Sequence, residues 1–136
     1  MATTHASSGF SISQIGQIAV VVRSLDDSIA FYRDRLGLPF LFQAPGMAFF
    51  KCGEVRLMLA LPEGPEAARG SSIIYYRVND IARAAEDLQS HGVLFVAKPH
   101  RVHKTDQMEL WMAFLKDPSE NLLALMEERS VATSGS

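Results

Sequence analysis

The sequence predicts an α+β fold with two βαβββ modules, whose curved and mostly antiparallel sheets surround a shared cavity with the helices outside. The first indication is an internal repeat, because Met47-Ala-Phe-Phe-Lys51 returns as Met112-Ala-Phe-Leu-Lys116. The second is that strand, helix and three strands follow one another in each half. The third is size, because a unit of roughly 55 residues buries only about 60% of its unfolded surface and gains stability from a second unit.

The first half begins with a β-branched run from Gln17 to Val22, which is typical of a strand. Ser24 can cap the helix that follows, because its hydroxyl can accept a hydrogen bond from a free backbone N–H of the first turn. Gly37 is suited to the left-handed conformation that ends many helices. The next strands are expected at residues 40–43, 47–51 and 55–61.

The second half repeats this order. A strand is expected from Ser72 to Val78, and either Asn79 or Asp80 can cap the next helix, which Gly92 ends. Further strands are expected at residues 93–97, 110–115 and 121–127. The polar segment 98–107 between them is expected to be irregular.

Changes in composition divide the chain into segments. Residues 63–70 are rich in proline, glycine and alanine, and both ends of the chain are small and polar. The expected division is a disordered tail at 1–13, a first module at 14–62, a linker at 63–70, a second module at 71–128 and a disordered tail at 129–136.

Composition excludes several classes of function. The chain has 136 residues, a net charge of -2 and no basic block, so nucleic acid is not an expected partner. It has no apolar run long enough to cross a membrane and no secretory signal, so we expect a cytoplasmic protein with no membrane partner. Its single cysteine, Cys52, is expected to be a packed small hydrophobe.

Several motifs, in this order, resemble those of the vicinal oxygen chelate superfamily, which contains glyoxalases, extradiol dioxygenases and bleomycin-resistance proteins. They are Gln17-Ile-Ala-Val-Val-Val-Arg-Ser-Leu25, Ser28-Ile-Ala-Phe-Tyr32, Tyr76-Arg-Val-Asn-Asp-Ile81 and Asp117-Pro-Ser-Glu-Asn-Leu-Leu-Ala-Leu125. The last motif departs from the family at Glu120, where glycine is common, and we expect this residue in a hairpin turn. The resemblance covers about residues 14–128 and implies the fold, a small-molecule ligand and a homodimer.

In that superfamily, four inward side chains from the first and last strand of each module can bind one divalent metal, which leaves positions open for substrate oxygens. The resemblance places these positions at Gln17, Met58, Ile73 and Ala124. The repeat supports this alignment, because Gln17 and Ile73 are 56 positions apart, as are Val22 and Val78. Only Gln17 has an oxygen donor, so we predict no metal cofactor at these positions.

A displaced metal site around Gln17, His103 and Glu109 is the alternative, and it implies a metal-dependent lyase, isomerase or dioxygenase. Histidines three positions apart lie on opposite faces of a regular strand, so His100 and His103 can share an ion only in a turn or helix. The segment 98–107 is expected to be a loop. It is either a solvated loop or a lid over the cavity mouth, where His103 can bind a ligand.

Strand alternation assigns the side chains that face the shared cavity. They are mainly apolar with a few polar groups, which is typical of a small-molecule pocket. The candidate ligand-binding residues are Gln17, Arg56, Met58, Ile73, Tyr75, Arg77, His103, Trp111 and Ala124. Arg56 and Arg77 can recognise a carboxylate. Phe49 and Phe114 are repeat partners and share a face, but the sequence does not say which one.

The leading hypothesis is a metal-independent member of the superfamily that binds a small, largely apolar or aromatic organic molecule, as sequestering resistance proteins do. The chain has no nucleophile elbow, phosphate-binding loop or dinucleotide fingerprint, so no catalytic residue is assigned and enzymatic activity stays open. A third hypothesis is a non-catalytic interaction module whose side chains fill the cavity.

Overall fold

The computed structural model describes residues 10, 12–62 and 72–131. The first half contains β1 (Gln17–Val21), α1 (Leu25–Ile29), η1 (Ala30–Arg35), β2 (Phe40–Ala44), β3 (Met47–Cys52) and β4 (Val55–Ala60). The second half contains β5 (Ile74–Arg77), α2 (Ile81–Ser90), β6 (Phe95–Lys104), β7 (Met108–Lys116) and β8 (Leu122–Ser130). The predicted linker and most of both predicted tails lie outside the described residues.

Each half forms a four-stranded mixed sheet of the same topology. The strand orders are β1-β4-β3-β2 and β5-β8-β7-β6, and in each sheet the first strand is parallel to the last while the other pairs are antiparallel. Ala19 lies opposite Met58 in the first sheet, and their repeat partners Tyr75 and Ala124 lie opposite each other in the second. The predicted α+β fold of two βαβββ modules is therefore confirmed.

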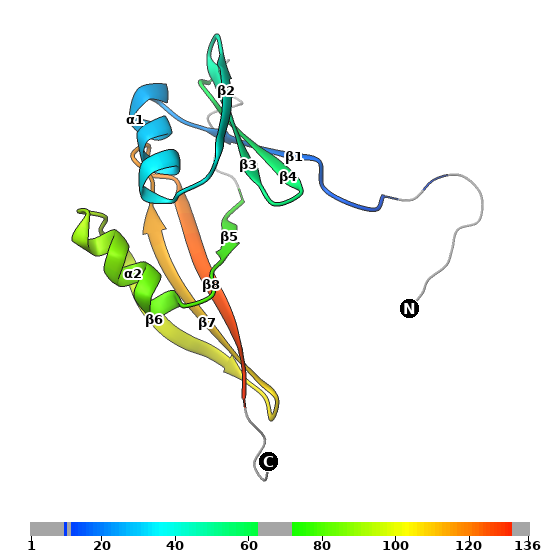
Figure 1. Ribbon diagram of the computed structural model, residues 1–136, viewed down its shortest axis with the longest axis vertical. Helices are drawn as coiled ribbons and strands as arrows, with labels where there is room; N and C mark the ends of the chain where they lie inside the picture. The colour runs from blue at the N-terminus through cyan, green and yellow to red at the C-terminus, as the bar shows by residue number, and fades with distance from the viewer. Residues whose placement is uncertain (1–9, 11, 63–71, 132–136) are drawn as a thin grey trace.

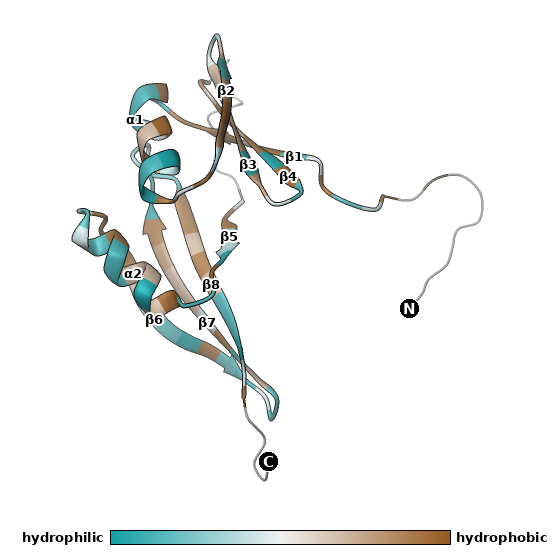
Figure 2. Ribbon diagram, viewed as in Figure 1, coloured by the Kyte–Doolittle hydropathy of each residue, from teal (hydrophilic) through white to brown (hydrophobic). Residues whose placement is uncertain are grey.

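Both helices lie on one side of the sheets (Figure 1). A single buried cluster fills the space beneath them and takes side chains from both halves, including Val22, Phe50, Leu59, Leu115 and Leu125. Figure 2 shows the apolar parts of β7 and β8 near the first module and the polar residues toward the far end of the β6–β7 hairpin. We call the opposite side of each sheet, which faces away from the helices, its open face.

The helix ends follow the predicted signals. The Ser24 hydroxyl accepts a hydrogen bond from the Asp27 backbone N–H, and the Asp80 carboxylate accepts one from that of Arg83, so Asp80 rather than Asn79 is the second cap. Gly37, with φ of 77°, follows the first helix in the left-handed region. The sequence did not predict that α1 widens into the π-helical segment η1, where the Leu36 N–H bonds to the carbonyl five residues earlier.

The prediction of a loop at residues 98–107 is wrong. Strand β6 continues to Lys104, and its pairing with β7 contains three register shifts. These β-bulges accommodate an irregular sequence in a strand, and Pro99 is tolerated because β6 is an edge strand whose outer N–H groups need no partner. Similarly, β8 continues to Ser130 opposite Met108, into the segment that was expected to be a disordered tail.

None of the described helices is long and apolar enough to cross a membrane.

Candidate functional site

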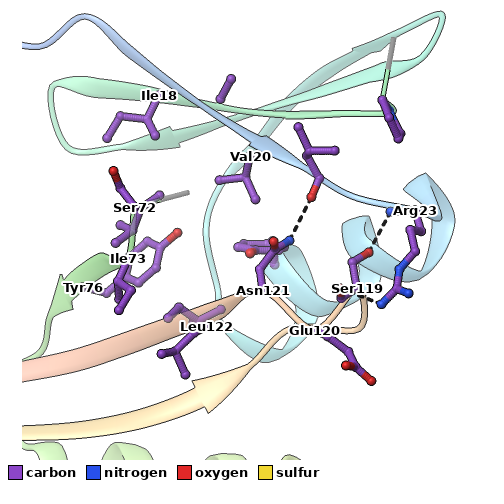
Figure 3. Close-up of a pocket in the computed structure, with 16 residues that line it drawn as sticks. Ile18, Val20, Arg23, Ser72, Ile73, Tyr76, Ser119, Glu120, Asn121 and Leu122 are labelled. Atoms are coloured by element: carbon purple, nitrogen blue, oxygen red, sulfur yellow. Dashed lines mark hydrogen bonds between the residues drawn. The ribbon is translucent and has the colours of Figure 1, made fainter. Parts of the chain in front are cut away.

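A buried hydrogen-bond network joins the two modules. Asp117 is 4% exposed, and one of its carboxylate oxygens accepts hydrogen bonds from the backbone N–H groups of Ser119 and Asn121. The other oxygen accepts one from the Tyr32 hydroxyl at 2.8 Å and one from the Asn121 amide at 2.9 Å. The same amide donates to the Val21 carbonyl oxygen (Figure 3). Burial and the adjacent carboxylate raise the pKa of Tyr32, which keeps its hydroxyl a donor.

The turn that supplies this network also contacts the end of β1. The Arg23 backbone N–H donates to the Ser119 hydroxyl at 2.8 Å, and the Arg23 guanidinium donates to the Ser119 carbonyl at 2.7 Å. Glu120 has a φ of 69°, a left-handed conformation that is uncommon for residues other than glycine. The departure from the family motif therefore lies in a turn, as expected.

Two cavities lie between the modules. The larger, of about 730 Å³, runs along β1 and the residues that lead into β5 (Figure 3). The smaller, of about 330 Å³, is lined mostly by apolar side chains, including Leu36 and Leu57. Tyr76 lines both, and its hydroxyl is buried without a hydrogen-bond partner in the described part of the chain. Of the candidate binding residues, Ile73 lines the larger cavity, whereas Tyr75 and Arg77 line the smaller one.

The open face of the first sheet brings three of the candidate residues together. The Arg56 Nε donates to the Gln17 side-chain oxygen at 2.7 Å, and the Gln17 amide nitrogen lies 3.8 Å from the Met58 sulfur. The Arg56 guanidinium lies 5.3 Å from the centre of the Phe49 ring, which stacks on Phe42 with a centroid distance of 4.4 Å. Phe49 therefore lies on the open face, which the sequence left undecided.

The residues at the four positions that the resemblance assigns to a metal do not fit a metal site. The Gln17 oxygen already accepts a hydrogen bond from a guanidinium, whose positive charge disfavours a metal ion at the same oxygen. Met58 offers only a soft thioether, while Ile73 and Ala124 offer no donor. In residues 10, 12–62 and 72–131, no three His, Cys, Asp or Glu side chains are grouped closely enough to bind an ion.

The open face of the second sheet has a different character. Arg77 donates to the Glu128 carboxylate at 2.7 Å, so its charge is already paired. Tyr75 is 43% exposed and its ring meets that of Phe114 edge to face, with centroids 6.1 Å apart. Ala124 is fully buried opposite both residues in the strand register. Phe114 therefore shares the open face with Tyr75, as its repeat partner Phe49 does in the first sheet.

The two histidines of β6 lie on one face rather than on opposite faces. His100 is opposite Met112 and His103 is opposite Leu110, and these two partners are separated by one residue on β7. Residues directly opposite each other in an antiparallel pair share a face, so the bulge between Arg101 and His103 brings both histidines to the open face. The expectation from a regular strand was wrong because it assumed an uninterrupted alternation.

Trp111 was placed wrongly among the residues of the shared cavity. It packs against the buried core on the helix side of the second sheet, where its indole N–H donates to Glu109 at 2.9 Å and the Arg129 guanidinium lies 4.3 Å from its ring centre. The indole and the nearby Arg101 hold the pKa of Glu109 below its usual range. Glu109 is thus paired on the helix side, away from His103 on the open face, which contradicts the displaced metal site.

Sequence reasoning also missed Lys51 and Phe42 on the open face of the first sheet. Cys52 pairs with Val55 around a two-residue turn, so Lys51 is directly opposite Arg56. The glycine in this turn was the available signal, because a short hairpin fixes which residues face each other. Phe42 had no such signal, because the register of β2 contains a bulge.

Comparisons with known proteins agree with this architecture. Residues 14–125 match the family described as the Glyoxalase/Bleomycin resistance protein/Dioxygenase superfamily. The chain belongs to this superfamily. It is 30% identical to the uncharacterized protein YraH of Bacillus subtilis (strain 168), over 80% of this chain and 94% of YraH.

Solved structures share the fold. Lactoylglutathione lyase from Agrobacterium tumefaciens aligns with a TM-score of 0.70 at 24% identity, over 85% of this chain and 94% of that one. TnmS3, an antibiotic binding protein from Streptomyces sp. CB03234, aligns with a TM-score of 0.72 at 23% identity, over 89% of this chain and all of that one. At these identities the alignments show the fold alone.

Proposed function

We propose that this superfamily member binds a small, largely apolar or aromatic organic molecule on its open faces without a divalent metal. The observation that carries the proposal is the hydrogen bond from Arg56 to Gln17, which places a fixed positive charge beside the one potential ligand oxygen among the four family positions. The Arg56 guanidinium thus lies beside a position that the resemblance assigns to a metal in other members. Recognition then depends on hydrogen bonds, charge and apolar contact.

The composition of the open faces supports an apolar or aromatic ligand. Phe49 and Phe42 form a stacked pair in the first sheet, and Tyr75 and Phe114 form an edge-to-face pair in the second. Aromatic rings of this kind bind flat organic molecules through large apolar contact areas. TnmS3 is an antibiotic binding protein on the same fold, so a binding role has a parallel among proteins of this architecture.

We also propose a homodimer in which a second copy helps to enclose the open faces. Several large apolar side chains near the first sheet are exposed: Leu41 at 47%, Phe42 at 48% and Ile15 at 59%. Apolar surface of this kind gains free energy when a partner covers it. Light scattering coupled to size-exclusion chromatography should give twice the chain mass, and a monomer across the accessible concentration range would contradict this part of the proposal.

The test of the proposed function combines metal analysis with binding of a neutral apolar dye. Protein purified without chelator should contain no stoichiometric divalent metal, and Nile red should gain fluorescence on binding. Met58→Lys should weaken dye binding because it adds a charge to the apolar part of the open face, whereas Leu94→Lys, at a residue that is 85% exposed, should not. Stoichiometric metal, or equal dye binding by the two variants, would contradict the proposal.

A further inference from the structure

Two positive charges lie directly opposite each other on the open face of the first sheet. Lys51 of β3 is the register partner of Arg56 of β4, and Arg56 is in turn the register partner of Gln17 of β1. Opposite side chains in an antiparallel pair have Cβ atoms about 5 Å apart, and like charges at this distance destabilise the sheet. The repulsion between Lys51 and Arg56 would be relieved by an anion bound between them.

Neither charge is neutralised by a carboxylate in the described part of the chain. Four other arginines have acidic partners there, and they are Arg33, Arg77, Arg101 and Arg129. Arg56 and Lys51 form no such pair, and both are exposed. The positive charge of this row is therefore available to an external anion.

The surroundings of Arg56 fix the orientation of its guanidinium. Its Nε donates to the Gln17 side-chain oxygen at 2.7 Å, and its Cζ atom lies 5.3 Å from the centre of the Phe49 ring. These contacts leave its two terminal nitrogens without a partner among the described residues. A guanidinium held in this way presents two parallel N–H donors, which match the two oxygens of a carboxylate.

The aromatic pair beside this row indicates what the rest of the anion looks like. Phe49 is only 8% exposed because Arg56 and Phe42 cover it, whereas Phe42 is 48% exposed. Met58 lies opposite Phe49 on the same face. An apolar or aromatic body attached to the carboxylate can rest on Phe42 and Met58 while the carboxylate reaches Arg56.

We propose that the row formed by Lys51, Arg56 and Gln17 recognises the carboxylate of a small organic acid whose apolar or aromatic body lies on Phe42 and Met58. The inference rests on the proposed function and names the chemical class of its ligand. Arg56 supplies the directed pair of hydrogen bonds, Gln17 orients Arg56, and Lys51 adds a second charge. No metal takes part in this recognition.

Calorimetric titration with phenylacetate and its neutral isostere phenylacetamide tests the inference. The two compounds have nearly the same shape, so the ratio of their dissociation constants isolates the contribution of the carboxylate. The dimeric wild-type protein should prefer phenylacetate by about tenfold, since hydrogen bonds between charged groups contribute this much or more. Arg56→Met should bring the ratio close to one, and Lys51→Met should lower it by about threefold in a salt-dependent manner.

Arg33→Met is the matched control, because it removes one positive charge from η1 on the helix side of the sheets, where Asp34 already neutralises Arg33. It should leave the ratio unchanged. Circular dichroism and the melting temperature establish that each variant is folded, and light scattering follows its assembly.

Several outcomes would overturn the inference. If wild-type protein binds both compounds equally, the carboxylate is not recognised, while the proposed function stands. If neither compound binds while Nile red does, the inference fails and the proposed function stands, and if none of the three binds, both fail. If Arg33→Met lowers the ratio as much as Arg56→Met, the preference reflects overall charge rather than this row. If Arg56→Met dissociates the dimer but keeps the ratio, Arg56 belongs to the interface between copies.

Discussion

The two modules have the same strand topology and register, but the positive charges on their open faces differ in whether an acidic side chain pairs with them. In the first, Arg56 and Lys51 lie opposite each other without an acidic partner in the described residues, beside a stacked aromatic pair. In the second, Arg77 is paired with Glu128, and Ala124 is buried beneath aromatic side chains. The two repeats thus share a backbone arrangement, while the side chains on their open faces differ.

This difference separates the proposed ligand recognition from the contacts that hold the modules together. The first module carries the polar groups that we propose to contact a ligand. The second module supplies the buried Asp117, which holds the modules together through Tyr32 and Asn121. One core cluster spans both modules, so we expect them to unfold together. The open faces can differ without affecting this shared core.

Substitutions in the core that the two modules share should reduce stability most. Leu59 and Leu125 are repeat partners and are 0% and 3% exposed in the common core. Each Leu→Ala change should lower the free energy of unfolding by about 2–5 kcal/mol, because it removes buried methyl groups and leaves a cavity. Urea denaturation should show one transition in both variants. Two separate transitions would mean that the modules unfold independently.

The next effect compares the two equivalent turns between the last strands of each module. Asp117→Ala should lower the free energy of unfolding by about 2–4 kcal/mol, because it leaves the Tyr32 hydroxyl and two backbone N–H groups without their acceptor. Glu54→Ala, in the exposed turn of the first module, should change it by less than about 0.5 kcal/mol. Urea denaturation measures both changes. If the two variants lose similar amounts of unfolding free energy, the Asp117 turn does not stabilise the fold more than the Glu54 turn.

A smaller effect tests whether charge pairing is what separates the two open faces. Glu128→Gln should change the free energy of unfolding by less than about 1 kcal/mol, because both partners in the pair with Arg77 are substantially exposed. It should also free Arg77, so in an Arg56→Met background it should restore a preference for phenylacetate of about threefold. If calorimetry gives equal dissociation constants for phenylacetate and phenylacetamide, a free positive charge on the second open face is not sufficient for carboxylate recognition.

The smallest effect concerns Cys52, which lies at the end of β3 and lines the smaller cavity between the modules. Burial raises the pKa of its thiol, so little thiolate is present at neutral pH. Iodoacetamide should therefore label Cys52 more slowly than it labels glutathione, as followed by intact mass. Labelling at the same rate or faster would show that the cavity exposes a reactive thiolate.

Much of the fold could be predicted because its signals are local. The repeat, the capping residues Ser24 and Asp80 and the glycine after each helix each act over a few residues. The length of β6 could not be predicted in this way. Its three register shifts depend on pairing with β7, and no local pattern in the polar segment 98–107 indicates them.

The candidate site was harder to predict because it depends on long-range pairing. Arg56 and Arg77 look equivalent in the sequence, and only the structure shows that Glu128 neutralises one of them. Trp111 was assigned to the wrong face because the sequence does not show which residues of β7 face the helices. Once Phe114 is known to lie on the open face, Trp111, three residues earlier, must face the helices.

We propose that the first open face binds an organic anion through Arg56 rather than through a metal. The most direct measurement is the dissociation constant of phenylacetate for wild-type protein, determined by calorimetry with excess EDTA and again with added Zn²⁺ or Mn²⁺. We expect the constants to agree within about twofold, because the side chains of the first open face already supply the recognition. Binding that disappears in EDTA, or that tightens about tenfold or more with either metal, would contradict the account.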